Sequence, residues 1–299
     1  MPFVEKYMSL AGITKSLAAW YQLLAGKINI KKFKYVIFSG ALVAFAFLLA
    51  QRFLLVGESM KFETLVIYTL AAILVSAGFG YVLHYFEGVD RSFRTFAYGS
   101  FMISTLVLSA FLSFIYYPNL TVAIKIVLAF FYAAMLYSIL LLNNLVVVVG
   151  SREESIPVYR VALSWVQIVL LGVSISLFTT LFKINVNPLV QIIFLTLFTL
   201  AFFNYFHYVY SYAGDVKTTT KPEKLTLIIS LSCLVSWSAF CILFFPTESF
   251  LRGIFVSSVF LLGLGYMQSY LKNSLGKRLI YDYAFISVFF FIILIVFKP

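Results

Sequence analysis

Long apolar stretches follow one another along almost the whole chain, with short polar segments between them. Most stretches reach about 20 residues, the length of helix that crosses a hydrocarbon core of about 30 Å. A soluble domain could not bury so many apolar surfaces, whereas a bilayer solvates them. The pattern predicts an all-α, polytopic integral membrane helical bundle with nine transmembrane helices. The predicted spans are residues 35–56, 63–86, 95–117, 121–149, 157–182, 188–213, 225–245, 250–271 and 279–297.

Composition agrees with this pattern, since 63% of the residues are hydrophobic and only 11% are charged. The charges lie almost entirely between the predicted spans. Pro118, Pro188 and Pro246 mark three of the turns, because proline interrupts a helix. A chain of 299 residues has no room for a separate soluble domain beside nine spans. We therefore expect one bundle over residues 34–299 with an N-terminal appendage at residues 1–33.

The appendage is predicted to be an amphipathic helix at the inner membrane surface. It has no compact apolar core followed by a small-residue cleavage site, so it is not a signal peptide. Its apolar residues recur at helical spacing, namely Leu10, Ile13, Leu17, Trp20 and Leu24. Its lysines, Lys6, Lys15, Lys27, Lys31 and Lys32, with the adjacent Lys34, favour contact with anionic headgroups. The alternative is a helix that packs against the cytoplasmic loops.

The distribution of positive charge predicts the orientation. The chain has 22 Lys and Arg against 11 Asp and Glu, a net charge of +11. With the N-terminus inside, sixteen of the 22 basic residues fall on the cytoplasmic side and six on the outer side. The positive-inside rule therefore places the N-terminus in the cytoplasm and, with nine spans, the C-terminus outside. One span more or fewer would reverse the C-terminus. The expected location is a cell membrane, in a bacterium because no organelle signal is visible.

A weak internal repeat is another hypothesis. A tyrosine, a small or polar residue and a second tyrosine occupy positions i, i+3 and i+4 in residues 81–85, 208–212 and 266–270. A Gly-x-Gly precedes the first and third of these motifs, at 78–80 and 263–265. The spacing would fit tandem helical hairpins after a lone first helix. Alternatively, the motifs reflect chance and the preference of tyrosine for membrane interfaces.

Polar residues in the spans gather toward the predicted inner side. The sixth span carries Asn204, His207, Tyr208 and Ser211 on one helical face. At similar depth lie Asn143, Asn144 and His84. These seven residues are the candidate polar vestibule, open to the cytoplasm, because polar groups are costly in lipid and turn inward. His207 is the central candidate, and Asn204 is expected to fix its tautomer. The alternative is that these residues hydrogen-bond helix to helix and stabilise the bundle.

Four arginines lie at the predicted inner rim, namely Arg91, Arg94, Arg160 and Arg278. They could contact phosphate or lipid headgroups. Arginines at this level also simply anchor helices at the interface.

Chemical motifs are otherwise missing from the sequence. We find no phosphate-binding loop, no metal-binding motif and no carboxylate in the middle of a span, so we expect no cofactor, no metal and no ion coupling. Cys233 and Cys241 lie eight residues apart on one helix, too far for a disulfide, and are expected to be packing residues. Cys233, with Ser232, Ser236 and Ala239, is assigned to a small-residue packing face.

The sequence thus favours a non-enzymatic protein that binds, assembles with or carries a lipid or an apolar partner. The expected partners are membrane lipids and other membrane proteins. Nucleic acid is not expected, because the positive charge follows topology. One alternative is a lipid-modifying enzyme with a cytoplasmic site around His207 and the inner-rim arginines, although no catalytic motif is present. Another alternative is a facilitator without ion coupling.

Overall fold

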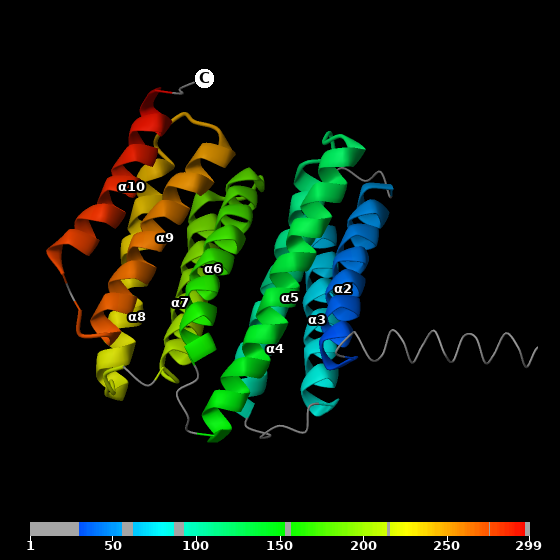
Figure 1. Ribbon diagram of the computed structural model, residues 1–299. Coiled ribbons are helices and arrows are strands. Elements are labelled where there is room, and N and C mark those ends of the chain that lie inside the picture. Colours follow the sequence, from blue (N-terminus) through cyan, green and yellow to red (C-terminus); the bar gives the residue numbers. More distant parts are fainter. Residues whose placement is uncertain are drawn as a thin grey trace, which may run out of the picture.

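The computed structural model describes residues 30–55, 62–86, 93–152, 157–213, 216–274 and 276–296. Within these ranges the regular structure is entirely helical, in nine helices (Figure 1). The helices are α2 (Ile30–Leu55), α3 (Phe62–Phe86), α4 (Phe93–Tyr116), α5 (Val122–Arg152), α6 (Pro157–Lys183), α7 (Pro188–Tyr210), α8 (Lys221–Ile242), α9 (Ser249–Leu271) and α10 (Lys277–Val296).

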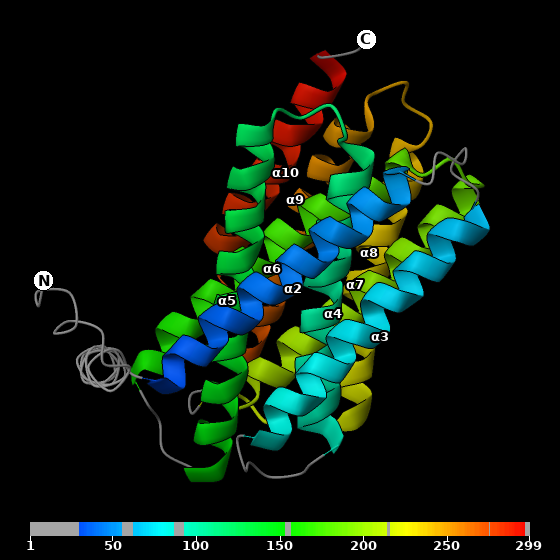
Figure 2. The ribbon, with the colours of Figure 1, turned by 90° about the vertical axis from the view of Figure 1, so that its right-hand side faces the viewer.

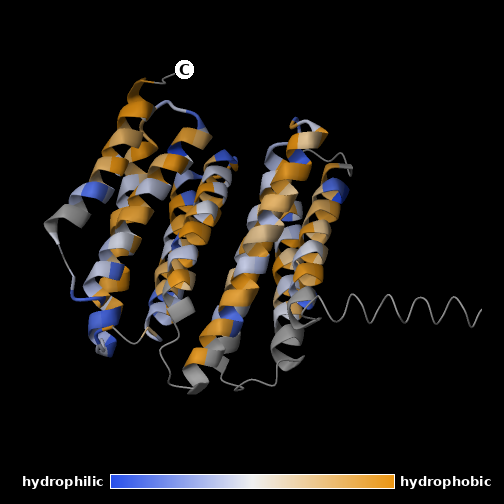
Figure 3. Ribbon diagram, viewed as in Figure 1, coloured by the Kyte–Doolittle hydropathy of each residue, from blue (hydrophilic) through white to orange (hydrophobic). Residues whose placement is uncertain are grey.

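Each of the nine predicted spans coincides with one of these helices, and the all-helical prediction is confirmed. Eight helices, α2 to α9, are long and apolar enough to cross a membrane. α10 is the shortest of the nine described helices, with 20 residues. Figure 3 shows the hydrophobic middle of the helices and the more hydrophilic ends. The chain is therefore a multi-pass membrane protein with eight clear candidate spans.

Successive helices run in opposite directions, so the helix ends and the connecting loops gather at the two ends of the bundle. The end at which α2, α4, α6 and α8 begin is here called the lower end, as it stands in Figure 1, and the opposite end is the upper end. Residues 1–29, most of the predicted amphipathic segment, lie outside the described residues. α2 begins at Ile30, a few residues before the predicted span.

The helices form two groups that meet through α4 and α6. α2, α3 and α5 all pack on α4, and α9 packs on α6, α8 and α10 (Figures 1 and 2). α4 contacts both groups and is the most enclosed helix, with 83% of its apolar stretch buried. Because α4 is surrounded by protein, its side chains contact other helices rather than lipid.

Glycines mark several helix contacts. A Cβ at Gly253 of α9 would lie 2.2 Å from the Thr179 hydroxyl of α6. A Cβ at Gly80 would lie 2.9 Å from the Ser100 hydroxyl of α4, and one at Gly265 would lie 2.3 Å from the ring of Tyr283 in α10. Small residues let helix backbones approach closely, and the resulting van der Waals packing is one of the forces that associate helices in lipid.

The two free cysteines are not packing residues, contrary to the prediction. Both Cys233 and Cys241 are exposed on α8. The buried face of α8 carries Ser232 and Ala239, and Ser236, also on this face, is hydrogen-bonded to Thr196 of α7 at 2.8 Å. Position 233 lies about 100° around the helix from position 232, which turns it away from α7.

Side chains cap the helices where the chain turns. Asn187 accepts a hydrogen bond from the Leu189 amide at 2.9 Å and precedes Pro188, the first residue of α7. Thr220 and Glu223 form a capping box at the start of α8. Both caps satisfy amides that a helix N-terminus leaves without partners.

Candidate functional site

The polar stripe of α7 lies beside the most buried face of its helix. His207 is buried, with 6% of its surface exposed, whereas Asn204 and Tyr208 are half-buried. Ser211 follows the last residue of α7, is exposed, and donates its hydroxyl to the Tyr208 carbonyl at 2.7 Å. The four residues therefore lie in different environments, from the interior to the lower surface.

His207 is held by the loop between α7 and α8. Its Nε2 is hydrogen-bonded to the Thr219 hydroxyl at 2.9 Å. Among the described residues no hydrogen bond joins His207 to Asn204, so the tautomer-fixing role of Asn204 stays a prediction. Thr219 lies just before α8, and the bond ties this loop to the end of α7.

Asn143 of α5 is in contact with α7 as well. It accepts a hydrogen bond from the Tyr205 hydroxyl at 3.2 Å, while the neighbouring Asn144 is half-buried. Tyr208 stacks on Tyr98 of α4, with ring centroids 4.2 Å apart. The structure thus brings the polar residues of α5 and α7 together, and tyrosines that the sequence analysis did not select link them to α4.

A second polar cluster closes the lower end between α8 and α9. The Lys217 ammonium donates to the Glu223 carboxylate at 2.7 Å and lies over the ring of Tyr270. Tyr270 also donates its hydroxyl to Glu223, and the Lys217 amide donates to the Leu271 carbonyl at 2.9 Å. The hydrogen bond from Lys217 to Glu223 raises the pKa of the Lys217 ammonium. The cluster fixes the loop across the end of α9.

Several predicted residues cannot be placed in this site. Arg91 lies outside the described residues. Four others lie in described helices, but their side chains are outside the description, namely His84 in α3, Arg94 in α4, Arg160 in α6 and Arg278 in α10. The inner-rim assignment therefore stays a prediction.

A buried hydroxyl cluster lies in the upper half of the bundle, where the sequence analysis expected almost only apolar residues. Tyr132 of α5 is fully buried, and its hydroxyl lies 2.8 Å from the Ser113 hydroxyl and 3.2 Å from that of Ser109. These serines are on α4, so the cluster joins two helices. Because serine lowers hydropathy little in an apolar run, the apolar pattern gave no sign of it.

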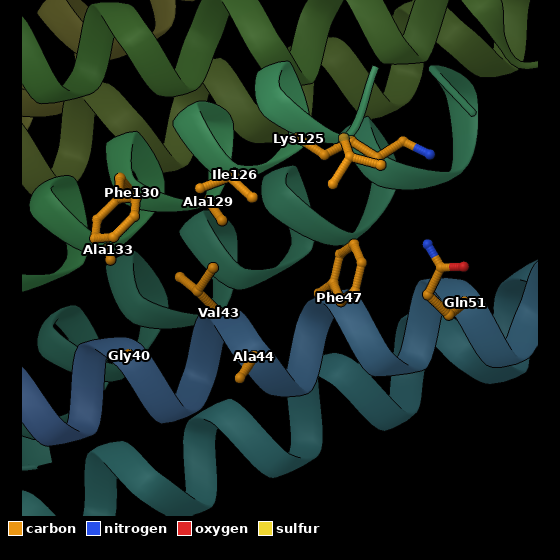
Figure 4. A pocket seen from close by; sticks show the side chains of 11 residues that line it. Gly40, Val43, Ala44, Phe47, Gln51, Lys125, Ile126, Ala129, Phe130 and Ala133 are labelled. Atoms are coloured by element: carbon orange, nitrogen blue, oxygen red, sulfur yellow. The ribbon is translucent and has the colours of Figure 1, made fainter. Parts of the chain in front are cut away.

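A groove between α2 and α5 runs along the upper half of the bundle (Figure 4). Its volume is about 650 Å³. From α2 it is lined by Gly40, Val43, Ala44, Phe47 and Gln51. From α5 it is lined by Val122, Lys125, Ile126, Ala129, Phe130 and Ala133. The glycine and the three alanines leave the space open between two helices that are otherwise in contact.

The groove is apolar along its length and polar at its upper end. Figure 4 shows Gln51 and Lys125 together at this end, with Gly40 and Ala133 at the other. None of these residues was among the candidate site residues predicted from the sequence. The groove could be found only once α2 was known to pack beside α5, since the two helices are far apart in the sequence.

The basic residues of the upper end differ in their partners. Lys183 donates to the Tyr116 carbonyl at 2.5 Å, and Arg252 donates to the Phe245 carbonyl at 2.9 Å. Within the described part of the chain, no hydrogen bond or ion pair engages the ammonium of Lys125. Its side chain is half-buried at the groove.

Comparisons of the chain with protein families, with curated proteins and with solved structures found no match.

Proposed function

We propose that this protein is a non-enzymatic membrane protein that binds a membrane lipid in the groove between α2 and α5. The groove carries the proposal. On α2 its lining extends from Gly40 to Gln51, a rise of about 16 Å at 1.5 Å per residue, and is apolar up to Gln51. This is about half of a 30 Å hydrocarbon core, the depth of one leaflet.

The contacts at the lower end favour a structural role for the polar stripe of α7. His207 is buried and bonded to Thr219, and Asn143 is bonded to Tyr205. A general acid or base needs access to a substrate proton, so a buried ring with an occupied Nε2 gives less support to the lipid-modifying enzyme. Helix-to-helix hydrogen bonding is the use of polar side chains that these contacts support.

The membrane, the number of crossings and the sides of the two termini are also proposals. We place the protein in a bacterial cell membrane, because no organelle signal is visible, with nine crossings on the evidence of the apolar stretches. The bias of Lys and Arg supports an N-terminus inside and, with nine crossings, a C-terminus outside. The tandem-hairpin repeat also remains a proposal. One observation supports the repeat: the second glycine of each Gly-x-Gly lies against the helix that follows. Gly80 of α3 lies against α4, and Gly265 of α9 lies against α10.

The experiment uses purified full-length protein in vesicles that contain a phospholipid with a photoactivatable group in its acyl chain. We expect cross-links concentrated on the groove residues of α2 and α5. Gly40→Leu should remove them, because a Cβ at Gly40 meets no atom within 4 Å and a larger side chain can therefore occupy the groove without a clash.

Gly78→Leu is the matched control. Gly78 is also an exposed helical glycine whose Cβ would meet no atom within 4 Å, but it lies on α3, outside the groove. This variant should keep the cross-links. The proposal is wrong if α2 and α5 are labelled no more than the exposed face of α10, or if Gly40→Leu labels like the parent protein.

A further inference from the structure

We infer that the groove is selective for an anionic phospholipid, whose headgroup phosphate is bound by Lys125 while one acyl chain follows the groove. The inference rests on the proposed lipid-binding function and adds the chemical class of the lipid. Lys125 lies at the polar upper end of the groove, which is otherwise apolar.

The groove is apolar along most of its length and polar at one end, which matches the acyl chain and the headgroup of one phospholipid. Phe47, Ala129 and Phe130 present carbon to the groove, and polar side chains occur at the upper end, where Gln51 and Lys125 lie together (Figure 4). An acyl chain therefore matches the walls below, and a headgroup matches the amide and the ammonium above.

The depth of the cation matches this arrangement. Lys125 is the fourth residue of α5, so it lies about 5 Å below the helix start at Val122. A phosphate at the interface is within the reach of a lysine at this depth, because long basic side chains extend toward the headgroups. An ammonium binds phosphate as a point charge with three donors.

Lys125 is the best candidate to bind the phosphate, because the other described basic residues at the upper end have partners or lie outside the groove. Lys183 and Arg252, at the same end, are already hydrogen-bonded to backbone carbonyls. Arg52 is exposed and is not part of the groove lining. Among the described basic residues of the upper end, Lys125 alone combines a place in the groove with an ammonium that no described group engages.

The test compares three photoactivatable lipids with the same acyl chains in full-length protein. The first is phosphatidylglycerol, which is anionic, the second is phosphatidylcholine, which is zwitterionic, and the third is diacylglycerol, which has no phosphate. We expect groove labelling by phosphatidylglycerol to exceed labelling by diacylglycerol roughly fivefold, which corresponds to about 1 kcal/mol for one lysine near the surface.

Lys125→Gln should reduce phosphatidylglycerol labelling to the level of diacylglycerol and leave diacylglycerol labelling unchanged. Arg52→Gln removes a charge from the same end of the bundle but from the other groove helix, α2, and should preserve the preference. Thermal unfolding of each variant checks that the bundle is intact.

The outcomes separate the two proposals. Equal groove labelling by all three lipids, unchanged by Lys125→Gln, would overturn the headgroup inference and keep the lipid-binding function. An equal loss of the preference in Arg52→Gln would also overturn it, since the effect would then come from general surface charge. Labelling of the groove by none of the lipids would overturn both.

Discussion

Gly253 of α9 lies directly against Thr179 of α6. A Cβ at position 253 would meet the Thr179 hydroxyl at 2.2 Å, its Cα at 2.6 Å and its amide nitrogen at 2.7 Å. Two of these three atoms are backbone, so a rotamer change cannot relieve the clash. The same helix pair is joined nearer the lower end by a 2.5 Å hydrogen bond from Gln167 to Gln268. The close approach at Gly253 therefore fixes how α9 packs on α6.

We expect Gly253→Ala to destabilise the protein by about 1–3 kcal/mol, the usual cost of overpacking. The two helices would have to separate to admit the methyl group. Reversible unfolding in mixed detergent micelles would measure the change. Gly78→Ala is the control, because its Cβ would lie in open space. Equal stability of the two variants would show that the α6–α9 contact is looser than the structure indicates.

The effect on stability of removing a buried hydroxyl should depend on whether that hydroxyl has a hydrogen-bond partner. Tyr132→Phe removes a hydroxyl that bonds to Ser109 and Ser113, and we expect a loss of about 0.5–1.7 kcal/mol, the range for hydrogen bonds between membrane helices. Ser257→Ala removes a buried hydroxyl that has no hydrogen-bond partner in the described structure. That change should be neutral or stabilising, because no bond is lost and a desolvated polar atom is removed.

The two variants are compared in the same unfolding assay. A large loss of stability in Ser257→Ala would mean that its hydroxyl has a partner, such as a water molecule. No loss in Tyr132→Phe would mean that the tyrosine hydroxyl contributes nothing to the packing of α4 against α5.

The bond between His207 and Thr219 distinguishes a structural from a functional histidine. In a double-mutant cycle of His207→Leu and Thr219→Val, we expect a coupling energy of about 0.5–2 kcal/mol. The bond is the reason for the coupling, since Nε2 and the hydroxyl lie 2.9 Å apart. A coupling near zero, together with unchanged or higher stability in His207→Leu, would instead support a hydrated site around the ring.

Reaction with a polar thiol reagent gives an independent measurement. A cysteine placed at 207 in a background without Cys233 and Cys241 should be protected in folded protein, because position 207 is buried. A cysteine at the exposed position 211 should react and serves as the control. Rapid reaction at 207 would contradict the structural role.

The sequence was sufficient for the helices but not for their contacts. Pro118, Pro188 and Pro246 lie at or between helix ends as predicted, because proline acts within its own segment. The partner of His207 was missed, since Thr219 is twelve residues away and approaches it only when the chain turns back. Local pattern cannot specify such a pair.

The groove was missed for the same reason on a larger scale. Gly40 and Ala133 are ordinary small residues in their own helices and acquire a role only when α2 packs beside α5. The polar stripe of α7 was found because its residues lie on one helix, where spacing alone places them on one face. The contacts of the stripe come from α4, α5 and the loop after α7. The sequence of α7 alone does not determine them.

The orientation of the C-terminus depends on whether α10 crosses the membrane. α10 is the shortest described helix, with 20 residues, which is enough for about 30 Å, and it packs along α9. The apolar stretches predict nine crossings, and the bias of basic residues predicts that the N-terminus is inside. A reporter fused after Pro299 should therefore be active only on the outer side, and one fused in the loop between α9 and α10 only in the cytoplasm. Cytoplasmic activity at both positions would show that α10 does not cross and that the protein has eight spans.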